Sequence, residues 1–218
     1  TIFVGVGLSM LIAAPIGAAA SQVGTLIMWA TEQAPLVMGI LVSVIVGVAL
    51  TLPISSAAIC AALGLTGLAG GAAVAGCCAQ MVGFAVMSYQ ENGVGGLVSQ
   101  GLGTSMLQMG NIIKNPRIWI APTLASAITG PLATCLFHFE MNGAAVSSGM
   151  GTCGLVGQIG VYTGWVNDIA AGTKAAITPM DWVAMVLICF VLPAVLSVVF
   201  CEVERKLGWI KEGDLKLN

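Results

Sequence analysis

The sequence predicts an all-α, polytopic integral membrane protein with about five transmembrane helices and two glycine-rich re-entrant segments. Of the 218 residues, 58% are apolar, the mean hydropathy is +1.01, and only 7% are charged, against about 25% in an average soluble domain. The charges are also widely spaced, and they leave apolar runs of the roughly 20 residues that cross a hydrocarbon core. A water-soluble fold could not bury this much apolar surface. The net charge of −2 gives no reason to expect a nucleic-acid partner.

Five apolar runs are predicted to form the transmembrane helices. In chain order they are Ile2–Trp29, Leu36–Ala62, Leu65–Tyr89, Trp119–Phe139 and Trp182–Cys201. The first run has no basic residue at its start and is followed by further apolar runs, so it is predicted to be a helix rather than a signal peptide. Within the third, Gly67 and Gly71 have the small-xxx-small spacing that allows a tight helix contact.

Two further segments, Gly93–Ile113 and Gly143–Trp165, are rich in glycine and in uncharged polar residues. Glycine at this density destabilises a helix and exposes backbone groups that hydrocarbon does not satisfy. Such segments survive at membrane depth where protein or a wet cavity surrounds them, and re-entrant hairpins meet this requirement. The alternative is an ordinary spanning helix whose glycines allow close packing.

The basic residues predict the orientation of the chain in the membrane. Lys114 and Arg117 precede the fourth predicted helix, and four more basic residues lie between positions 202 and 218. The positive-inside rule places both clusters in the cytoplasm, so an even number of crossings must separate them. Two predicted helices supply these crossings, and Gly143–Trp165 is therefore expected to enter and leave on one side. We predict a membrane domain over residues 1–201 and a cytoplasmic tail over 202–218.

Polar side chains inside a membrane protein are costly and are the first candidates for function. The densest group gives six candidates for solute binding: His138, Glu140, Asn142, Ser147, Ser148 and Gln158. His138 and Glu140 would lie about 200° apart on a helix, so they would share a site only if the chain is extended there. The alternatives are a structural or interfacial histidine near a helix end and a carboxylate in an interfacial loop.

The sequence contains no motif of a self-contained catalytic site. It has no nucleophile elbow, Walker A loop, HExxH motif or dinucleotide-binding fingerprint, so a part in an enzymatic reaction stays an open question. The seven cysteines lie in apolar surroundings without a CxxC pair or a histidine at metal-ligand spacing. We expect neither a metal ion nor another cofactor. Uncharged hydrogen-bonding groups beside broken membrane segments favour a neutral, polyhydroxylated solute.

Three stretches of the chain resemble the enzyme IIC membrane proteins of the phosphotransferase system, and among these the toxin-regulator, or perfringolysin O regulator-like, branch. They are LTLPISSAAICAALGLTGLAGGAA (Leu50–Ala73), NIIKNPRIWIAPTLASAITGPLA (Asn111–Ala133) and SSGMGTCGLVGQIGVY (Ser147–Tyr162), in this order. The resemblance covers nearly the whole chain. Members of this branch extend further at the N-terminus, so the chain is expected to be the C-terminal portion of such a protein.

The resemblance implies a sugar-permease fold, usually a homodimer in the bacterial plasma membrane. Such a protein binds a small polar solute and carries it inward for phosphorylation by a separate cytoplasmic enzyme IIB. It also implies that the Asn115-Pro116 break and the Ser147–Gln158 loop contribute to the solute site, which adds Asn115 to the candidates. Two other kinds of function remain open: a membrane-embedded sensor or regulator without transport, and a structural subunit of a larger complex.

Overall fold

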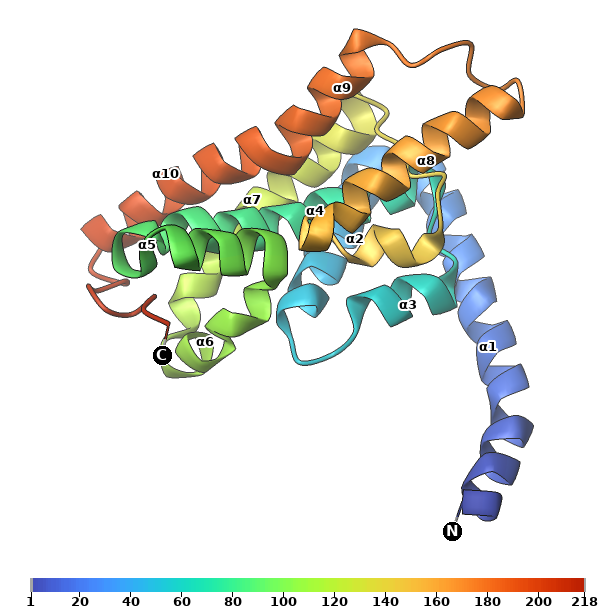
Figure 1. Cartoon of the computed structure of the whole chain (residues 1–218), viewed down its shortest axis with the longest axis horizontal. Coiled ribbons are helices and arrows are strands. Elements are labelled where there is room, and N and C mark those ends of the chain that lie inside the picture. The colour runs from blue at the N-terminus through green and yellow to red at the C-terminus, as the bar shows by residue number, and fades with distance from the viewer. Residues whose placement is uncertain (1, 218) are drawn as a thin grey trace.

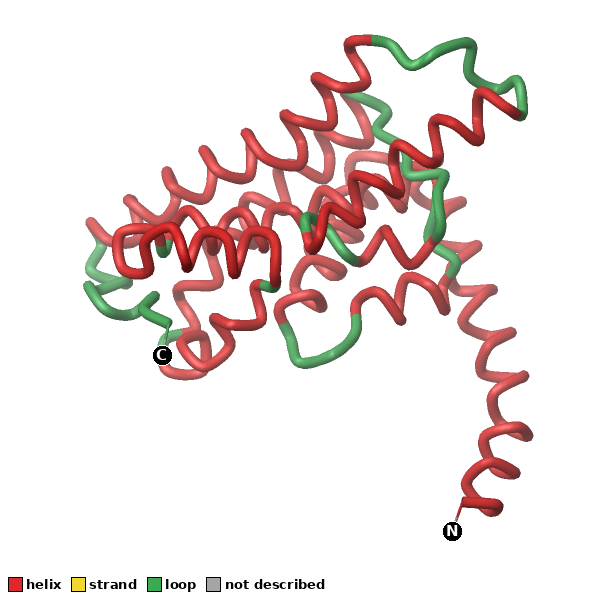
Figure 2. Tube along the Cα trace, viewed as in Figure 1, coloured by secondary structure: helices red, strands yellow, loops and turns green. Residues whose placement is uncertain are grey.

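The computed structural model of the chain describes residues 2–217, with side chains from Gly17 onward, and is built almost entirely of helices (Figures 1 and 2). The α-helices are α1 (Ile2–Gln33), α2 (Pro35–Thr51), α3 (Ser56–Leu63), α4 (Gly67–Met87), α5 (Tyr89–Val98), α6 (Met109–Lys114), α7 (Ile120–Pro131), α8 (Val156–Ala170), α9 (Pro179–Val186) and α10 (Leu192–Lys206). Short 3-10 and π-helical turns join or extend several of them. Within the described range no β-strand forms, and the predicted all-α class is confirmed.

Three helical stretches among the described residues are long and apolar enough to cross a membrane. They are α4, the stretch Pro116–Leu136 that contains α7, and the stretch Pro179–Lys206 that joins α9 and α10 through a π-helical turn. The apolar helix α2 is shorter, at 17 residues. The predicted helix over Ile2–Trp29 falls within α1, although the side chains of residues 2–16 lie outside the described part. The chain is an all-α membrane protein.

The helix α4 lies at the centre of the fold, against α2, α7 and α10. Its most apolar window is 89% buried, as expected of a helix that is apolar on all sides. A Cβ added to Gly76 would lie 1.9 Å from the carbonyl oxygen of Ser43, so the backbones of α2 and α4 touch. The Ser43 hydroxyl donates to the Ser126 carbonyl at 2.8 Å, and the Ser126 hydroxyl donates to the Gly76 carbonyl at 3.3 Å. These bonds join α2, α4 and α7.

The prediction of one helix over Leu36–Ala62 is wrong, because the structure divides this run into α2 and α3. Pro53 lies in the break and has no backbone N–H to donate to a continuing helix. Ser55 then caps α3 by accepting a hydrogen bond from the Ala58 amide at 3.1 Å. The run is apolar throughout, so its hydropathy did not indicate that one helix ends and another begins within it.

The first glycine-rich segment forms a hairpin that returns to the end of the molecule it leaves. The helix α5 continues into a π-helical turn (Ser99–Gly103), and a 3-10 turn leads the chain back into α6. Asn92 on the outgoing limb and Gln108 on the returning limb both donate to the Leu215 carbonyl, at 2.8 and 3.0 Å. A segment whose two limbs meet one atom has the geometry of the predicted re-entrant hairpin.

The second glycine-rich segment also folds back on itself. The chain passes through two 3-10 turns (Ala145–Gly149 and Cys153–Leu155) and returns as α8. A Cβ on Gly143 would lie 2.2 Å from the Gly160 carbonyl oxygen, so the two limbs touch through their backbones. The glycines therefore do allow close packing, but within a broken hairpin and not along one spanning helix. Its entry to and exit from the membrane on one side remain a prediction.

The C-terminal segment, Gly208–Leu217, folds back beside α5 and α6 (Figure 1). The helix α10 continues to Lys206, beyond the predicted helix end at Cys201. After it, Ile210 and Leu215 are 3% and 0% exposed. Residues 202–218 therefore do not form a freely extended tail in the part that the structure describes.

Amide side chains of the first hairpin bind the backbone of this C-terminal segment. Gln108 Nε2 donates to Gln100 Oε1 at 2.9 Å, and Asn111 Nδ2 donates to Gln108 Oε1 at 2.8 Å. Gln108 also donates to the Leu215 carbonyl and Asn111 to the Lys216 carbonyl, each at 3.0 Å. A buried polar network of this kind is stable only when its members are paired, so the C-terminal segment completes the hairpin.

Candidate functional site

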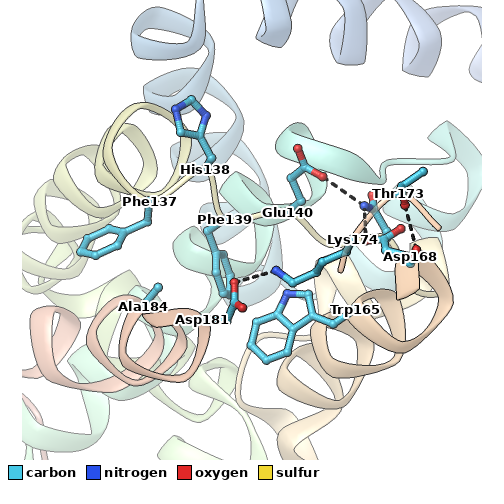
Figure 3. Close-up of a pocket in the computed structure, with 11 residues that line it drawn as sticks. Phe137, His138, Phe139, Glu140, Trp165, Asp168, Thr173, Lys174, Asp181 and Ala184 are labelled. Atoms are coloured by element: carbon cyan, nitrogen blue, oxygen red, sulfur yellow. Dashed lines mark hydrogen bonds and ion pairs between the residues drawn. The ribbon is translucent and has the colours of Figure 1, made fainter. Parts of the chain in front are cut away.

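A polar pocket of about 460 Å³ opens beside the start of α9, at the other end of the Pro179–Lys206 stretch from the C-terminal segment (Figure 3). This volume lies in the range of small-molecule sites. The lining residues come from the non-helical segment after α7, from α8 and the loop after it, and from α9. They are Phe137, His138, Phe139, Glu140, Asn142, Trp165, Asp168, Thr173, Lys174, Asp181 and Ala184.

The non-helical segment Phe137–Asn142 forms one wall of the pocket and is held by the start of α4. Gly67 and Met141 exchange two backbone hydrogen bonds of 2.9 and 3.0 Å. A Cβ on Gly71 would lie 1.6 Å from the Phe139 carbonyl oxygen, so only glycine allows this crossing. Gly67 and Gly71 thus hold this non-helical segment, and the tight contact of their glycine-rich tract with another helix lies at Gly76 against α2.

His138 and Glu140 both line the pocket, because the chain is not helical here and a helix would have separated them (Figure 3). His138 has a φ of +44°, a strained conformation of the kind that is concentrated at binding sites. Asn142 Nδ2 donates to Glu140 Oε2 at 3.1 Å and to Asp168 Oδ2 at 2.9 Å. The amide of Asn142 therefore bridges two carboxylates at the pocket wall.

The opposite wall carries an ion pair and aromatic side chains. Lys174 Nζ lies 2.7 Å from Asp181 Oδ1 and 5.6 Å from the centroid of the Trp165 ring. Asp181 is fixed at the start of α9 by a capping box with Thr178. Trp182 packs edge-on against Trp165, which is only 5% exposed. Trp165 therefore supports the wall of the pocket, and its ring is not open for a solute to stack on.

The charges of the pocket restrict the kind of solute it suits. Three carboxylates (Glu140, Asp168 and Asp181) face one ammonium group (Lys174) and the single histidine. The excess of acidic groups disfavours an anion, whereas carboxylate and amide groups pair readily with hydroxyls. Among the described residues, no three His, Cys, Asp or Glu side chains are grouped to hold a metal ion.

Three of the predicted site residues, Ser147, Ser148 and Gln158, are buried outside this pocket, at 6%, 0% and 7% exposed. The Ser148 hydroxyl donates to the Leu65 carbonyl at 2.7 Å. Gln158 Nε2 lies 3.2 Å from Cys78 Sγ, while its Oε1 has no hydrogen-bond partner in the described part of the chain. These contacts connect the second hairpin to the region of α4. A role in solute binding stays a prediction for all three residues.

Asn115 lies at the C-terminal segment, away from the pocket. Its Nδ2 donates to the Trp209 carbonyl at 2.9 Å and to Asp214 Oδ2 at 2.8 Å. The structure does not bring it together with His138 and Glu140, and its part in solute binding also remains a prediction.

Sequence reasoning missed Asp168, Lys174 and Asp181, none of which was among the predicted site residues. One signal was available, because three charged residues within a short stretch are unusual in a chain that is 7% charged. A second was the Thr178-Pro179 start of a helix with Asp181 in its first turn, a capping pattern that fixes the direction of that carboxylate.

A polar pocket lined by one limb of a broken hairpin, within a membrane fold, is typical of membrane solute carriers. A family model described as "Phosphotransferase system, EIIC" matches residues 1–217, and the chain belongs to this family. The protein is thus a membrane component of a phosphotransferase system, which works with other parts of that system such as enzyme IIB. Neither a curated protein nor a solved structure gave a significant match to the chain. The predicted relationship to the enzyme IIC family is confirmed.

Proposed function

We propose that the protein is the permease component of a sugar phosphotransferase system, and that the polar pocket binds its solute, a neutral sugar. The observation that carries the proposal is the Asn142 amide held between Glu140 and Asp168 beside His138. Each carboxylate has acceptor capacity beyond the single bond to Asn142, and hydroxyl-to-carboxylate hydrogen bonds are short and strong. Several such acceptors around one cavity favour a ligand that is rich in hydroxyl groups.

The proposal includes an orientation, with the C-terminal segment on the cytoplasmic side of the bacterial plasma membrane. Lys174 is the one Lys or Arg of the seven that lies outside the two basic clusters. These clusters meet in the fold, because the Arg117 guanidinium lies 5.6 Å over the Trp209 ring. The positive-inside rule then favours a cytoplasmic location for this end. The pocket would open toward the outer face, where a permease receives its solute.

The family resemblance supports three finer parts of the proposal: a homodimer, a separate cytoplasmic enzyme IIB as partner, and membership of the toxin-regulator branch. The mass of the purified protein in detergent tests whether it is a homodimer. Co-purification with the enzyme IIB encoded by the same cell tests the partner. Membership of the toxin-regulator branch predicts that expression of a toxin gene changes when the gene for this protein is deleted.

Uptake of a panel of radiolabelled sugars tests the transport function. Cells that express the protein are expected to accumulate one sugar as its phosphate ester, and only when the general phosphotransfer proteins are present. Uptake that does not depend on those proteins would exclude the phosphotransferase mechanism. Solute binding without flux would favour the sensor instead.

Two variants test the pocket itself. Glu140→Gln and Asp168→Asn are each expected to lower uptake about tenfold or more, because a hydrogen bond to a charged group contributes about 1.5–3 kcal/mol and about 1.4 kcal/mol is a factor of ten. Glu32→Gln is the matched control, since Glu32 is exposed and lies outside the pocket. Full uptake by both pocket variants, at normal membrane abundance, would show that the solute binds elsewhere.

A further inference from the structure

A groove without charged side chains lies beside the Pro179–Lys206 stretch, separate from the solute pocket. Its volume is about 220 Å³. Val82 and Val86 of α4 line it together with Val98 and Leu102 from the region where α5 passes into its π-helical turn. Phe190, from the turn before α10, completes the lining. Three different elements thus form one apolar groove.

A smaller cavity of about 140 Å³ adjoins this groove and shares Val86 with it. Its lining includes Tyr89 and Gln90 at the start of α5, and Glu202 and Arg205 in the last turns of α10. The groove and the cavity therefore meet at Val86, and together they make a surface with an apolar end and a charged end.

The length and polarity of this surface match one leaflet of a bilayer. Phe190 and Arg205 lie on one helical stretch, and 15 residues at 1.5 Å per residue span about 22 Å, while half of the hydrocarbon core is about 15 Å thick. Tyr89 and Trp209, both at the charged end, are 48% and 40% exposed. Aromatic side chains of this type collect at the membrane–water interface. This arrangement fits a bilayer in which the apolar groove is at acyl-chain depth and the cavity at headgroup depth.

The charged end offers partners for both signs of a headgroup. The guanidinium of Arg205 lines the cavity and donates to Gln90 Oε1 at 3.1 Å and to Glu91 Oε1 at 3.3 Å. Glu202 is exposed and lines the same cavity. A guanidinium pairs well with a phosphate, and a carboxylate pairs with an ammonium group.

We propose that this surface binds one glycerophospholipid whose headgroup carries an ammonium group. An acyl chain lies in the groove between Val98 and Phe190, the phosphate contacts Arg205, and the ammonium group contacts Glu202. Charges of both signs at the mouth of an apolar groove fit such a lipid better than they fit the apolar helix face of a second copy of the chain. This inference is independent of which solute the protein carries.

Lipid retention during purification tests the proposal. The protein is extracted from membranes that contain phosphatidylethanolamine and phosphatidylglycerol, and the lipids bound to it are identified by native mass spectrometry. The unchanged protein is expected to retain one phosphatidylethanolamine per chain. Val98→Trp, which fills the groove, is expected to lower retention about tenfold. Val195→Trp is the control, because Val195 is similarly exposed (54% against 51%) but lines neither cavity.

The headgroup contact has its own pair of variants. Glu202→Gln is expected to lower the preference for phosphatidylethanolamine over phosphatidylglycerol about threefold, as for the loss of one partly exposed ion pair. Glu212→Gln, which removes an exposed carboxylate outside both cavities, is expected to leave the preference unchanged. Thermal unfolding of each variant checks that it is folded.

Three results would overturn the proposal. The first is an unchanged protein that retains no lipid, and the second is a Val98→Trp variant that retains as much as its control. The third is a change of oligomeric state in Val98→Trp at unchanged lipid content, which would show that a second copy covers the groove.

Discussion

Gly71→Ala is the substitution that tests most directly how the pocket wall is held. The added methyl carbon would lie 1.6 Å from the Phe139 carbonyl oxygen. The obstacle is backbone and not the end of a flexible side chain, so the non-helical segment must move by about 2 Å to reach ordinary contact distance. This movement pulls Met141 away from Gly67, and the two hydrogen bonds of 2.9 and 3.0 Å between them are lost.

The expected loss of stability for Gly71→Ala is about 2–3 kcal/mol, from roughly 1 kcal/mol for each of the two hydrogen bonds and a similar amount for lost packing. For a chain of this length, each kcal/mol lowers the unfolding temperature by about 2–4 °C. The variant is therefore expected to unfold about 5–10 °C below the unchanged protein. It is also expected to lose solute uptake, because His138 and Glu140 move with the wall.

A thiol-reactive fluorescent dye provides the assay. The exposed Cys135 reacts in the folded protein and sets the baseline, whereas Cys77 and Cys78 are both 0% exposed and add to the signal only when the protein unfolds. Gly95→Ala is the matched control. Nothing lies within 4 Å of a Cβ at Gly95, and alanine is the better helix former by up to about 1 kcal/mol. If Gly71→Ala unfolds at the same temperature as Gly95→Ala and keeps full uptake, the account of the pocket wall is refuted.

Two further predictions concern the C-terminal segment. Leu215→Ala is expected to lower the free energy of unfolding by about 2–5 kcal/mol, because the side chain is 0% exposed. Its control in the same dye assay is Leu207→Ala. Leu207 is 58% exposed, so this variant is expected to change the free energy of unfolding by less than about 0.5 kcal/mol. Gln108→Ala is expected to release the C-terminal segment, because it removes bonds to the Leu215 carbonyl and to Gln100 that contribute about 1 kcal/mol each. Limited trypsin digestion at Lys211 should become faster in this variant, and an unchanged digestion rate would argue against the amide network as the holding element.

The membrane class could be predicted from the sequence because a bilayer imposes one simple requirement, a long apolar run for each crossing. The stretches Gly67–Met87, Pro116–Leu136 and Pro179–Lys206 meet it, and the predictions for these regions agree with the structure to within a few residues. Hydropathy alone could not locate the break between α2 and α3. That break depends on Pro53 and on the Ser55 cap, and neither makes the run less apolar over a long window.

The candidate site was predictable only in part. Glu140 and His138 stood out as costly polar groups near a helix end, and the structure brings both into one pocket. Their partner Asp168 is 26 residues further along the chain from Asn142, to which it is bonded. Which distant charged residue turns toward such a pocket depends on how the second hairpin packs against α4, and no local pattern in the sequence contains that information.

The way in which the C-terminal segment is held has a consequence for sequence variation. The amides of Asn92, Gln108 and Asn111 bind main-chain atoms, which every amino acid supplies alike. Outside the buried Ile210 and Leu215, the hydrogen-bonded Asp214 and the positive-φ glycines Gly208 and Gly213, the segment is therefore expected to tolerate substitution while it stays docked. Selection could then adjust the charge of this end of the molecule to suit a soluble partner without rebuilding the fold.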